Sequence, residues 1–266
     1  MTREPVVAGQ FYPGGKDNLL RDLSEMIPDR KDKIDAIGAI VPHAGYMCSG
    51  FVAGEVYGKL KQKDTYIILG PNHTGHGSQF ASCKESWLTP LGTVDIDIEM
   101  LDAMMRETDL ITDDESAHAF EHSIEVQVPF VQKTAPSAKI VPVTVQNGTL
   151  PELEEVSEAI VSAMKGAPGS AMILASSDMT HYEPRNAAEK KDKLAIQKVI
   201  DIDPEGLLKV VMENSISMCG CIPSAIMLMC AKKMNALKSE LVKYSDSGDA
   251  TGDTSSVVGY AGMVVY

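Results

Sequence analysis

The sequence has few aromatic residues and a marked deficit of positive charge. Aromatic residues make up 5% of the 266 residues, with a single tryptophan, so we do not expect a large stacking surface for polycyclic substrates. Lysine and arginine total 24 against 37 aspartates and glutamates, which gives a formal net charge of −13. Because binding to phosphates needs a basic face, this imbalance argues against nucleic acid and anionic membranes as partners.

Segments that would direct the chain to a membrane or an oxidising compartment are also missing. No apolar run reaches the length of a membrane span, and residues 1–5 lack the apolar core of a signal peptide. The five cysteines are an odd number without regular spacing. This pattern indicates free thiols in a reducing compartment, and we therefore expect a cytoplasmic protein.

Sequence motifs for nucleotide binding are absent as well. Gly14, Gly15 and Lys16 lack the preceding strand and the spacing of a P-loop, and no G-x-G-x-x-G follows a strand, so we expect no nucleotide cofactor. The chain shows no repeat, low-complexity segment or flexible linker. Hydrophobic residues make up 44% of it, enough for a sizeable core. These features predict one domain over residues 1–266.

Apolar periodicity predicts an α/β fold with a central, mostly parallel or mixed sheet flanked by helices. The order of strand, helix and strand over residues 36–69 suggests a βαβ unit with a parallel pair. Residues 79–97 form an excursion containing a hairpin or short strands. Pro142 suggests that its strand lies near a sheet edge. Strands are expected at 36–41, 66–69, 139–145, 171–175, 241–244 and 257–265, and helices at 16–26, 50–60, 99–107, 124–131, 151–165, 187–200, 204–213 and 222–234.

One local pattern occurs three times, in which an apolar strand ends at a turn and a histidine follows. Residues 36–41 lead to His43, residues 66–69 to His73, and residues 171–175 to His181. In open α/β sheets, ligands bind in the crevice beyond the carboxyl ends of the strands. The pattern therefore predicts that three imidazoles meet at one rim of the sheet.

The chain has six histidines, and two or three imidazoles with one anionic ligand can hold iron, copper or zinc at an open site. Taken singly, each histidine is as well explained by a capping or loop role. Taken as a set at strand ends, they favour a site. We assign His76 and His118 to the surface or to the surroundings of the site.

Two further groups contain carboxylates near histidines. Asp178 lies three residues before His181 and could fix its tautomer for acid–base catalysis, or it could cap a turn. Glu121, His122 and Glu125 could supply a carboxylate that orients a ligand, or a proton shuttle. The alternative for this second group is a solvated helix start.

The cysteines at residues 219 and 221 precede an apolar helix. A thiolate there would lie at a helix N-terminus, which makes either one a soft metal ligand or a nucleophile. The alternative is a pair of small buried residues. Cys48, Cys83 and Cys230 are assigned to packing.

Five motifs, in this order, make the chain resemble the Memo family, which includes protein B of the AmmeMemoRadiSam system. The resemblance extends from residues 8–12 to residues 259–262. The motifs are PHAGY at 42–46, LGPNH at 69–73, EHSIEVQ at 121–127, SSDMTH at 176–181 and CG at 219–220.

The family is similar in fold to the LigB-like class III extradiol dioxygenases, which hold iron(II) with two histidines and a glutamate. The resemblance implies that His43, His73 and Cys219 bind the metal. It further implies that His181 is the acid–base residue with Asp178 beside it. His122, Glu125, Glu121 and Tyr46 would line or surround the pocket.

A cysteine in place of the dioxygenase glutamate makes the ligand set softer. A soft thiolate moves the preference toward copper(I) or zinc, although iron(II) remains possible. From the resemblance as a whole we expect one metal ion, with iron or copper favoured and zinc possible. Our leading hypothesis is metal-dependent redox chemistry on a small substrate. The alternatives are a non-catalytic module that recognises a peptide or partner protein through the same cleft, and a zinc hydrolase.

Overall fold

The computed structural model describes residues 2–266 and consists of a large mixed sheet, a small second sheet and helices on both faces. The strands are β1 Thr2–Arg3, β2 Gly38–Val41, β3 Thr65–Pro71, β4 Phe80–Ser82, β5 Ser86–Thr89, β6 Gly92–Val94, β7 Ile111–Asp113, β8 Lys139–Val145, β9 Ala171–Ser176, β10 His181–Glu183, β11 Ser239–Asp246 and β12 Val257–Val265. The α-helices are α1 Lys16–Met26, α2 Tyr46–Lys59, α3 Ile98–Glu107, α4 Val128–Thr134, α5 Leu150–Gly166, α6 Arg185–Ile200, α7 Pro204–Glu213, α8 Cys221–Lys233 and α9 Gly248–Thr251. Two short 3₁₀ helices, η1 Glu115–Ala117 and η2 Glu125–Gln127, precede α4.

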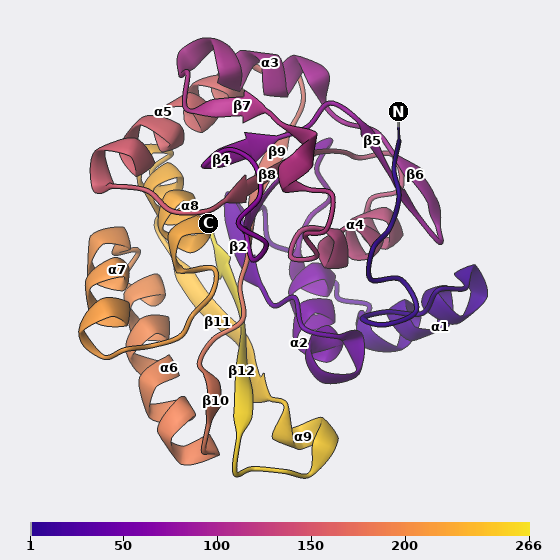
Figure 1. Ribbon diagram of the computed structural model, residues 1–266, viewed down its shortest axis with the longest axis vertical. Coiled ribbons are helices and arrows are strands. Elements are labelled where there is room, and N and C mark those ends of the chain that lie inside the picture. The colour runs from indigo at the N-terminus through magenta and orange to yellow at the C-terminus, as the bar shows by residue number, and fades with distance from the viewer. Residues whose placement is uncertain (1) are drawn as a thin grey trace.

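The nine-stranded sheet has the order β10-β12-β2-β9-β3-β8-β4-β7, with β11 paired to β12. Helices α1, α2 and α4 lie on one side of it, and α5 to α8 lie on the other (Figure 1). The small sheet, β1-β5-β6, holds the N-terminal strand and the predicted hairpin. Residues from both sheets belong to one hydrophobic cluster. The prediction of a single α/β domain with a mixed central sheet is confirmed.

Local sequence signals explain where several helices begin. Thr149 and Glu152 form a capping box at the start of α5, with Pro151 in its first turn. Asp97 caps α3 by accepting a hydrogen bond from the backbone N–H of Met100 at 3.1 Å.

Among residues 2–266, no helix is both long and apolar enough to cross a membrane.

The predicted parallel pair of β2 and β3 is wrong in one respect. The two strands run in the same direction, but β9 lies between them and pairs in parallel with both. The register aligns the carboxyl ends, because Val41 of β2 lies opposite Ser176 and Leu69 of β3 lies opposite Ala175. The third histidine strand therefore occupies the centre of this group, which the chain order could not show.

The prediction that Pro142 places its strand near an edge is also wrong. Strand β8 pairs with β3 along its whole length and with β4 on the other side. The β4 ladder covers only Val143 to Val145, so Pro142 lies just outside it. The missing N–H of the proline therefore removes no bond from that ladder, which explains how an interior strand accommodates it.

The close approach of α1 and α2 generates a stability prediction. A Cβ atom at Gly54 of α2 would lie 2.1 Å from the backbone oxygen of Met26. We expect Gly54→Ala to lower the free energy of unfolding by about 1–3 kcal/mol because the helices must separate. Gly166→Ala is the matched control: nothing lies within 4 Å of a Cβ there, so its stability should stay equal or rise by up to about 1 kcal/mol. Urea unfolding of both variants measures the difference, and equal stabilities would contradict the packing argument.

Candidate metal centre

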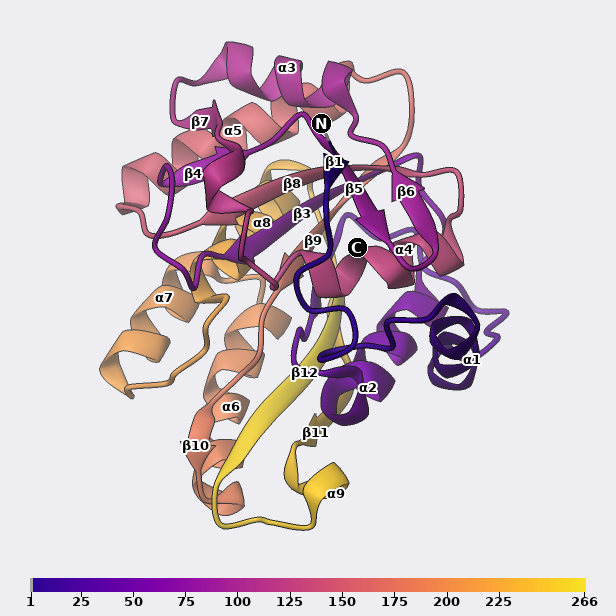
Figure 2. The same ribbon diagram turned by 45° about the vertical axis from the view of Figure 1, so that its right-hand side comes forward.

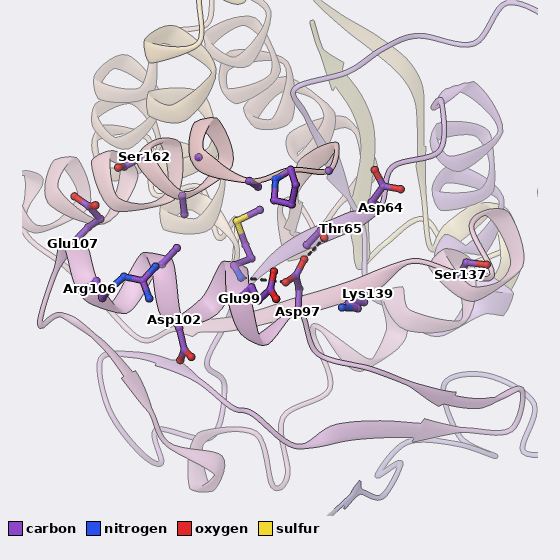
Figure 3. A pocket seen from close by; sticks show the side chains of 17 residues that line it. Asp64, Thr65, Asp97, Glu99, Asp102, Arg106, Glu107, Ser137, Lys139 and Ser162 are labelled. Atoms are coloured by element: carbon purple, nitrogen blue, oxygen red, sulfur yellow. Dashed lines mark hydrogen bonds between the residues drawn. The ribbon is translucent and has the colours of Figure 1, made fainter.

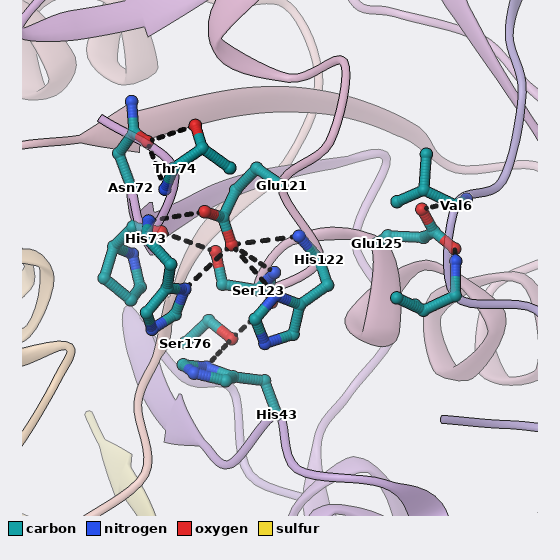
Figure 4. A network of polar contacts seen from close by, with 12 residues as sticks. Val6, His43, Asn72, His73, Thr74, Glu121, His122, Ser123, Glu125 and Ser176 are labelled. Carbon is teal, nitrogen blue, oxygen red and sulfur yellow. Dashed lines mark hydrogen bonds and ion pairs between the residues drawn. The ribbon is translucent and has the colours of Figure 1, made fainter. Parts of the chain in front are cut away.

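Two of the three imidazoles that the sequence predicts at one rim meet at the carboxyl ends of the central strands, whereas His181 is not part of their group. His43 follows β2 by two residues, and His73 follows β3 by two. Their ring centroids are 5.4 Å apart, although the residues come from different strands (Figure 4). Ser176 is the last residue of the intervening strand β9, and its Oγ lies 2.9 Å from Nδ1 of His43 (Figure 4).

A third imidazole, His122, joins them from the loop between η1 and η2. Its ring centroid is 4.8 Å from that of His73 and 5.6 Å from that of His43. One nitrogen of each ring can be chosen so that all three lie within 4.8 Å of one another, close enough to hold a metal ion. The family resemblance implied only that His122 lines the pocket, so its place among the clustered imidazoles emerges from the structure alone.

Cys219 approaches this group from the turn before α8. Its sulfur is 3.3 Å from Nε2 of His43 and 3.3 Å from the backbone nitrogen of Asp178. The neighbouring Gly220 makes this approach feasible, because a Cβ atom there would lie 2.3 Å from the backbone oxygen of Ser176. Metal–sulfur and metal–nitrogen bonds are about 2.0–2.3 Å long, so the sulfur and the His43 nitrogen are near enough to bind one ion.

A chain of hydrogen bonds fixes which nitrogen of His43 carries the proton. Ser176 Oγ donates to the backbone oxygen of Ser123 at 2.6 Å and accepts from Nε2 of Gln127 at 2.9 Å. Its hydroxyl proton is thereby used, so the 2.9 Å contact with Nδ1 of His43 must be an N–H donated by the ring. Nε2 of His43 then presents a lone pair toward Cys219, which is the form that a metal ligand needs.

Glu121 plays the same part for His73. Its Oε1 accepts from Nδ1 of His73 at 2.9 Å, and its Oε2 accepts from the backbone N–H of His73 at 2.5 Å. The same carboxylate accepts the backbone N–H groups of His122 and Ser123 at 2.9 and 2.8 Å (Figure 4). A carboxylate behind a ligating histidine fixes the ring and raises its basicity. The predicted orienting carboxylate of this motif is thus Glu121.

The other carboxylate of that motif, Glu125, serves a different purpose. It is fully buried, and its oxygens accept from Arg3, from the backbone N–H groups of Val6 and Val7, and from the hydroxyl of Tyr12. Figure 4 shows it turned away from the histidines, toward Val6. The prediction that Glu125 lines the pocket is replaced by a role in holding the N-terminal segment.

Tyr46 also lies away from the expected position. Its hydroxyl donates to the backbone oxygen of Val126 at 2.9 Å, and its ring packs against Tyr12 and Phe130. The side chain is buried in the hydrophobic cluster. It supports α2 and the η2 turn from within the core.

Asp178 and His181 do not form the hydrogen-bonded pair that their spacing suggests. Asp178 Oδ1 accepts the backbone N–H groups of His43 at 2.8 Å and Ala44 at 3.3 Å. The ring of His181 contacts Ser217 instead: its Nδ1 is 2.9 Å from the Ser217 carbonyl oxygen, which can only accept. Nδ1 of His181 is therefore protonated and Nε2 is free to accept a proton. Within residues 2–266 no hydrogen bond joins the two side chains.

Burial and neighbouring charges shift the pKa values of the three imidazoles in different directions. Burial would lower the pKa of His73, but the hydrogen bond and charge of Glu121 outweigh it and raise that pKa. Burial, with the charges of His73 and His122, holds the pKa of His43 well below its usual value. Burial likewise lowers the pKa of His122. Burial raises the pKa of the Cys219 thiol, and the charge of Asp178 adds to the effect. A bound cation reverses this last preference, because a coordinating thiol is deprotonated.

The residues present fit a single transition-metal ion. Neutral imidazoles and a thiol suit copper, zinc and iron. His43 is 2% exposed, whereas the His73 side chain is 35% exposed. The group is therefore closed to solvent at His43 and open at His73. An open side is typical of catalytic metal sites, since structural zinc sites are enclosed by four protein ligands.

A well-formed cavity of the described chain lies away from the histidines. It measures about 690 Å³ and is found where β3 and β8 begin, between α3 and α5 (Figure 3). It therefore opens at the amino ends of the strands, opposite the histidines. Charged side chains of both signs surround it, including Asp102 and Arg106.

Sequence reasoning missed the residues that orient the ligands through buried hydrogen bonds. Gln127 and Ser176 set the tautomer of His43, and Ser217 sets that of His181. Gln127 and Ser176 fall within two of the recognised motifs, but neither residue type signals such a role by itself. Cys83 and Cys230 are buried and Cys48 is half-buried, in accordance with their assignment to packing. His76 is exposed, in accordance with its assignment to the surface.

Comparison with known proteins places these residues in a family context. A family model described as Memo-like protein matches residues 3–264. A MEMO1 family protein of Methanopyrus kandleri is 42% identical, with 99% of each chain covered. Another from Sulfurisphaera tokodaii is 44% identical over 98% of each chain, and one from Methanosarcina acetivorans is 39% identical over 99% of this chain and 98% of its own.

The Glu121 carboxylate gives a pH-dependent prediction. Burial would raise its pKa, but the hydrogen bonds and charge of His73 and the backbone N–H groups of Ser123 and His73 outweigh burial and lower the pKa to about 2. A pKa lowered in the folded state stabilises the protein above the unfolded value and loses that effect as the pH falls through the folded value. The shift corresponds to about 3 kcal/mol.

We therefore expect Glu121→Gln to reduce the free energy of unfolding most above pH 4.5, with the gap from wild type closing toward pH 2. Urea unfolding of both proteins from pH 6 to pH 2 measures this. A gap that does not depend on pH would show that the carboxylate charge contributes nothing.

Proposed function

The chain belongs to the Memo family, and on that premise we propose that it binds one transition-metal ion for redox chemistry on a small substrate. His43, His73 and His122 would hold the ion, with Cys219 as a thiolate ligand beside His43. The observation that carries the proposal is the placement of three ring nitrogens within 4.8 Å of one another at the open end of the sheet.

We take iron or copper as the expected ion, with zinc as the alternative. Imidazole suits all three metals, and the thiolate adds a preference for copper(I) and zinc, so metal analysis has to decide between them. When bound, such an ion supplies one-electron chemistry or activation of dioxygen. The protein supplies imidazoles whose Nδ1 atoms are held by Ser176 and Glu121, which leaves Nε2 of His43 and His73 to face the ion.

We assign His181 the role of acid–base residue at this site. Its Nδ1 is bonded to the Ser217 carbonyl, so Nε2 is the nitrogen that can accept a proton. A positive charge on His181 lowers the pKa of both His43 and Asp178, which supports a location near the histidine group. Asp178 contributes indirectly, by holding the backbone of His43.

The expected partner is a small molecule or a peptide side chain that enters from the open side of the site. A net charge of −13 disfavours polyanions such as nucleic acid. A non-catalytic binding module would use the same cleft without needing a redox-active ion.

Metal content separates these functions. Protein purified without a metal-affinity column should contain one iron or copper ion per chain. The variants His43→Ala, His122→Ala and Cys219→Ser should each lose this ion or bind it more weakly. His76→Ala is the matched control, because His76 is exposed and lies outside the group, and it should keep the full content. Elemental analysis after dialysis against a chelator gives the stoichiometry.

Each result has a distinct meaning. Stoichiometric zinc would favour the hydrolase alternative, in which the metal lowers the pKa of bound water. Absence of metal in the wild type, even after addition of each ion, would reject the metal-centre proposal and leave the binding module. Retention in Cys219→Ser but loss in His122→Ala would restrict the ligand set to the histidines.

The role of His181 is tested by activity. We expect the loaded wild type to consume oxygen in the presence of catechol, and His181→Ala to bind metal normally but react about 10²–10⁴-fold more slowly, because an acid–base group is lost. An oxygen electrode measures the rate. An unchanged rate would remove His181 from the chemistry, and no consumption by wild type would reject catechol oxidation.

A further inference from the structure

Arg3 is a buried cation at the start of the chain, far in sequence from the histidine group. It lies in the short strand β1, is 8% exposed, and its guanidinium carbon is 4.0 Å from the centre of the Trp87 ring. Arginine is almost never this buried unless it is paired. Its partners therefore indicate what the residue does.

The guanidinium bonds to both arms of the loop that carries His122. Its Nε donates to the backbone oxygen of His118 at 2.9 Å, and Nη2 donates to the backbone oxygen of Glu121 at 2.7 Å. Its Nη1 donates to the carboxylate of Glu125 at 2.8 Å. One rigid side chain thus joins residues 118, 121 and 125.

The rest of the N-terminal segment reinforces this attachment. The backbone N–H groups of Val6 and Val7 and the hydroxyl of Tyr12 all donate to Glu125, at 2.7–3.0 Å. The ring of Phe11 lies 4.8 Å, centroid to centroid, from the ring of His122. The segment therefore contacts the loop at its base and at its functional side chain.

The position of this loop decides two features of the site at once. His122 is one of the three clustered imidazoles, and Glu121 orients His73 through Nδ1. Arg3 bonds the backbone oxygen of Glu121, which belongs to the peptide group that links Glu121 to His122. A shift of that peptide would displace both side chains.

We propose that Arg3 is a positioning residue of the metal centre, which holds loop 118–125 so that His122 and Glu121 face the other ligands. This inference rests on the proposed function. A planar guanidinium presents several donors in a fixed geometry, whereas a lysine ammonium is a point charge on a flexible stem. Lysine at this position can keep the ion pair with Glu125 but cannot reproduce the three directed bonds.

The test compares Arg3→Lys and Arg3→Met with Arg30→Met. Arg30 is a partly buried arginine paired with Glu55 in the second half of α2, so its loss controls for the removal of a buried ion pair. Because Arg3→Met leaves Glu125 buried without its cation, Arg3→Lys serves as the variant that retains the charge. Circular dichroism confirms folding of each protein before use.

Affinity for Zn²⁺, measured by competition with a chelator, is the first readout. We expect it to be about 10–100-fold weaker in both Arg3 variants, the usual effect of losing a group that orients metal ligands, and unchanged in Arg30→Met. The visible spectrum of Co²⁺-loaded Arg3→Lys should differ from that of the wild type and resemble the spectrum of Co²⁺-loaded His122→Ala. Wild-type affinity and spectrum in a folded Arg3→Lys would overturn the inference while leaving the metal centre intact.

A second readout does not require metal. In the metal-free protein, the ¹⁵N and ¹H resonances of the His122 and His73 rings should shift in Arg3→Lys and stay unchanged in Arg30→Met. If the wild type binds no metal, the proposed function fails, but these shifts still decide whether Arg3 positions the loop. Unchanged ring resonances in a folded Arg3→Lys would reject the positioning role.

Discussion

Parallel pairing of β2, β9 and β3 is the constraint on which the candidate site depends. Parallel strands that are aligned in register end at the same edge of the sheet, so the residues that follow them are brought together whatever their separation in sequence. His43 and His73 meet at this edge, and Ser176 of the central strand supports one of them from below. The helices on both faces bury these strands and thereby fix the pairing.

The hydrogen-bond partners of the histidine rings decide which ring nitrogen carries the proton, and thus which one can bind a metal. An imidazole can bind a metal only through an unprotonated nitrogen, so the other nitrogen must give its proton to an acceptor. Ser176 can only accept from His43, because its hydroxyl proton is donated to the backbone oxygen of Ser123 and Gln127 is itself a donor to it. Glu121 accepts from His73 as an anion, which burial alone would not favour. The buried hydrogen bonds thus select the ligand form of each ring.

The site is bounded by segments of very different character. The apolar sheet lies on one side of it, and loop 118–125 forms another side and is bonded to the sheet through His118 and Ser123. That loop is held by the N-terminal segment through Glu125 and Arg3, a pair separated by 122 residues. The open side and the exposed part of His73 leave room for a ligand, whereas the cavity between α3 and α5 lies at the other end of the strands and shares none of these residues.

Local sequence was sufficient to predict most helices and strands, because periodicity and capping act over a few residues: α1 and α7 begin and end where expected, and His43 and His73 were identified from the strands before them. The three strands do end at one edge of the sheet, but the predicted pairing of β2 with β3 was wrong, since pairing is decided by packing between distant elements. The same applies to the roles of Asp178, Glu125 and Tyr46. Spacing paired Asp178 with His181, and the family resemblance placed Glu125 and Tyr46 at the pocket, whereas their actual partners lie up to 135 residues away.

The sequence by itself determined the fold class, the family and the residue types available for metal binding. Only the tertiary structure decided that His122 stands with His43 and His73, that Ser217 rather than Asp178 orients His181, and that Arg3 reaches loop 118–125. The physical reason is that a hydrogen bond or an ion pair between distant segments leaves no periodic trace in either one. It exists only once the sheet has brought those segments to the same edge.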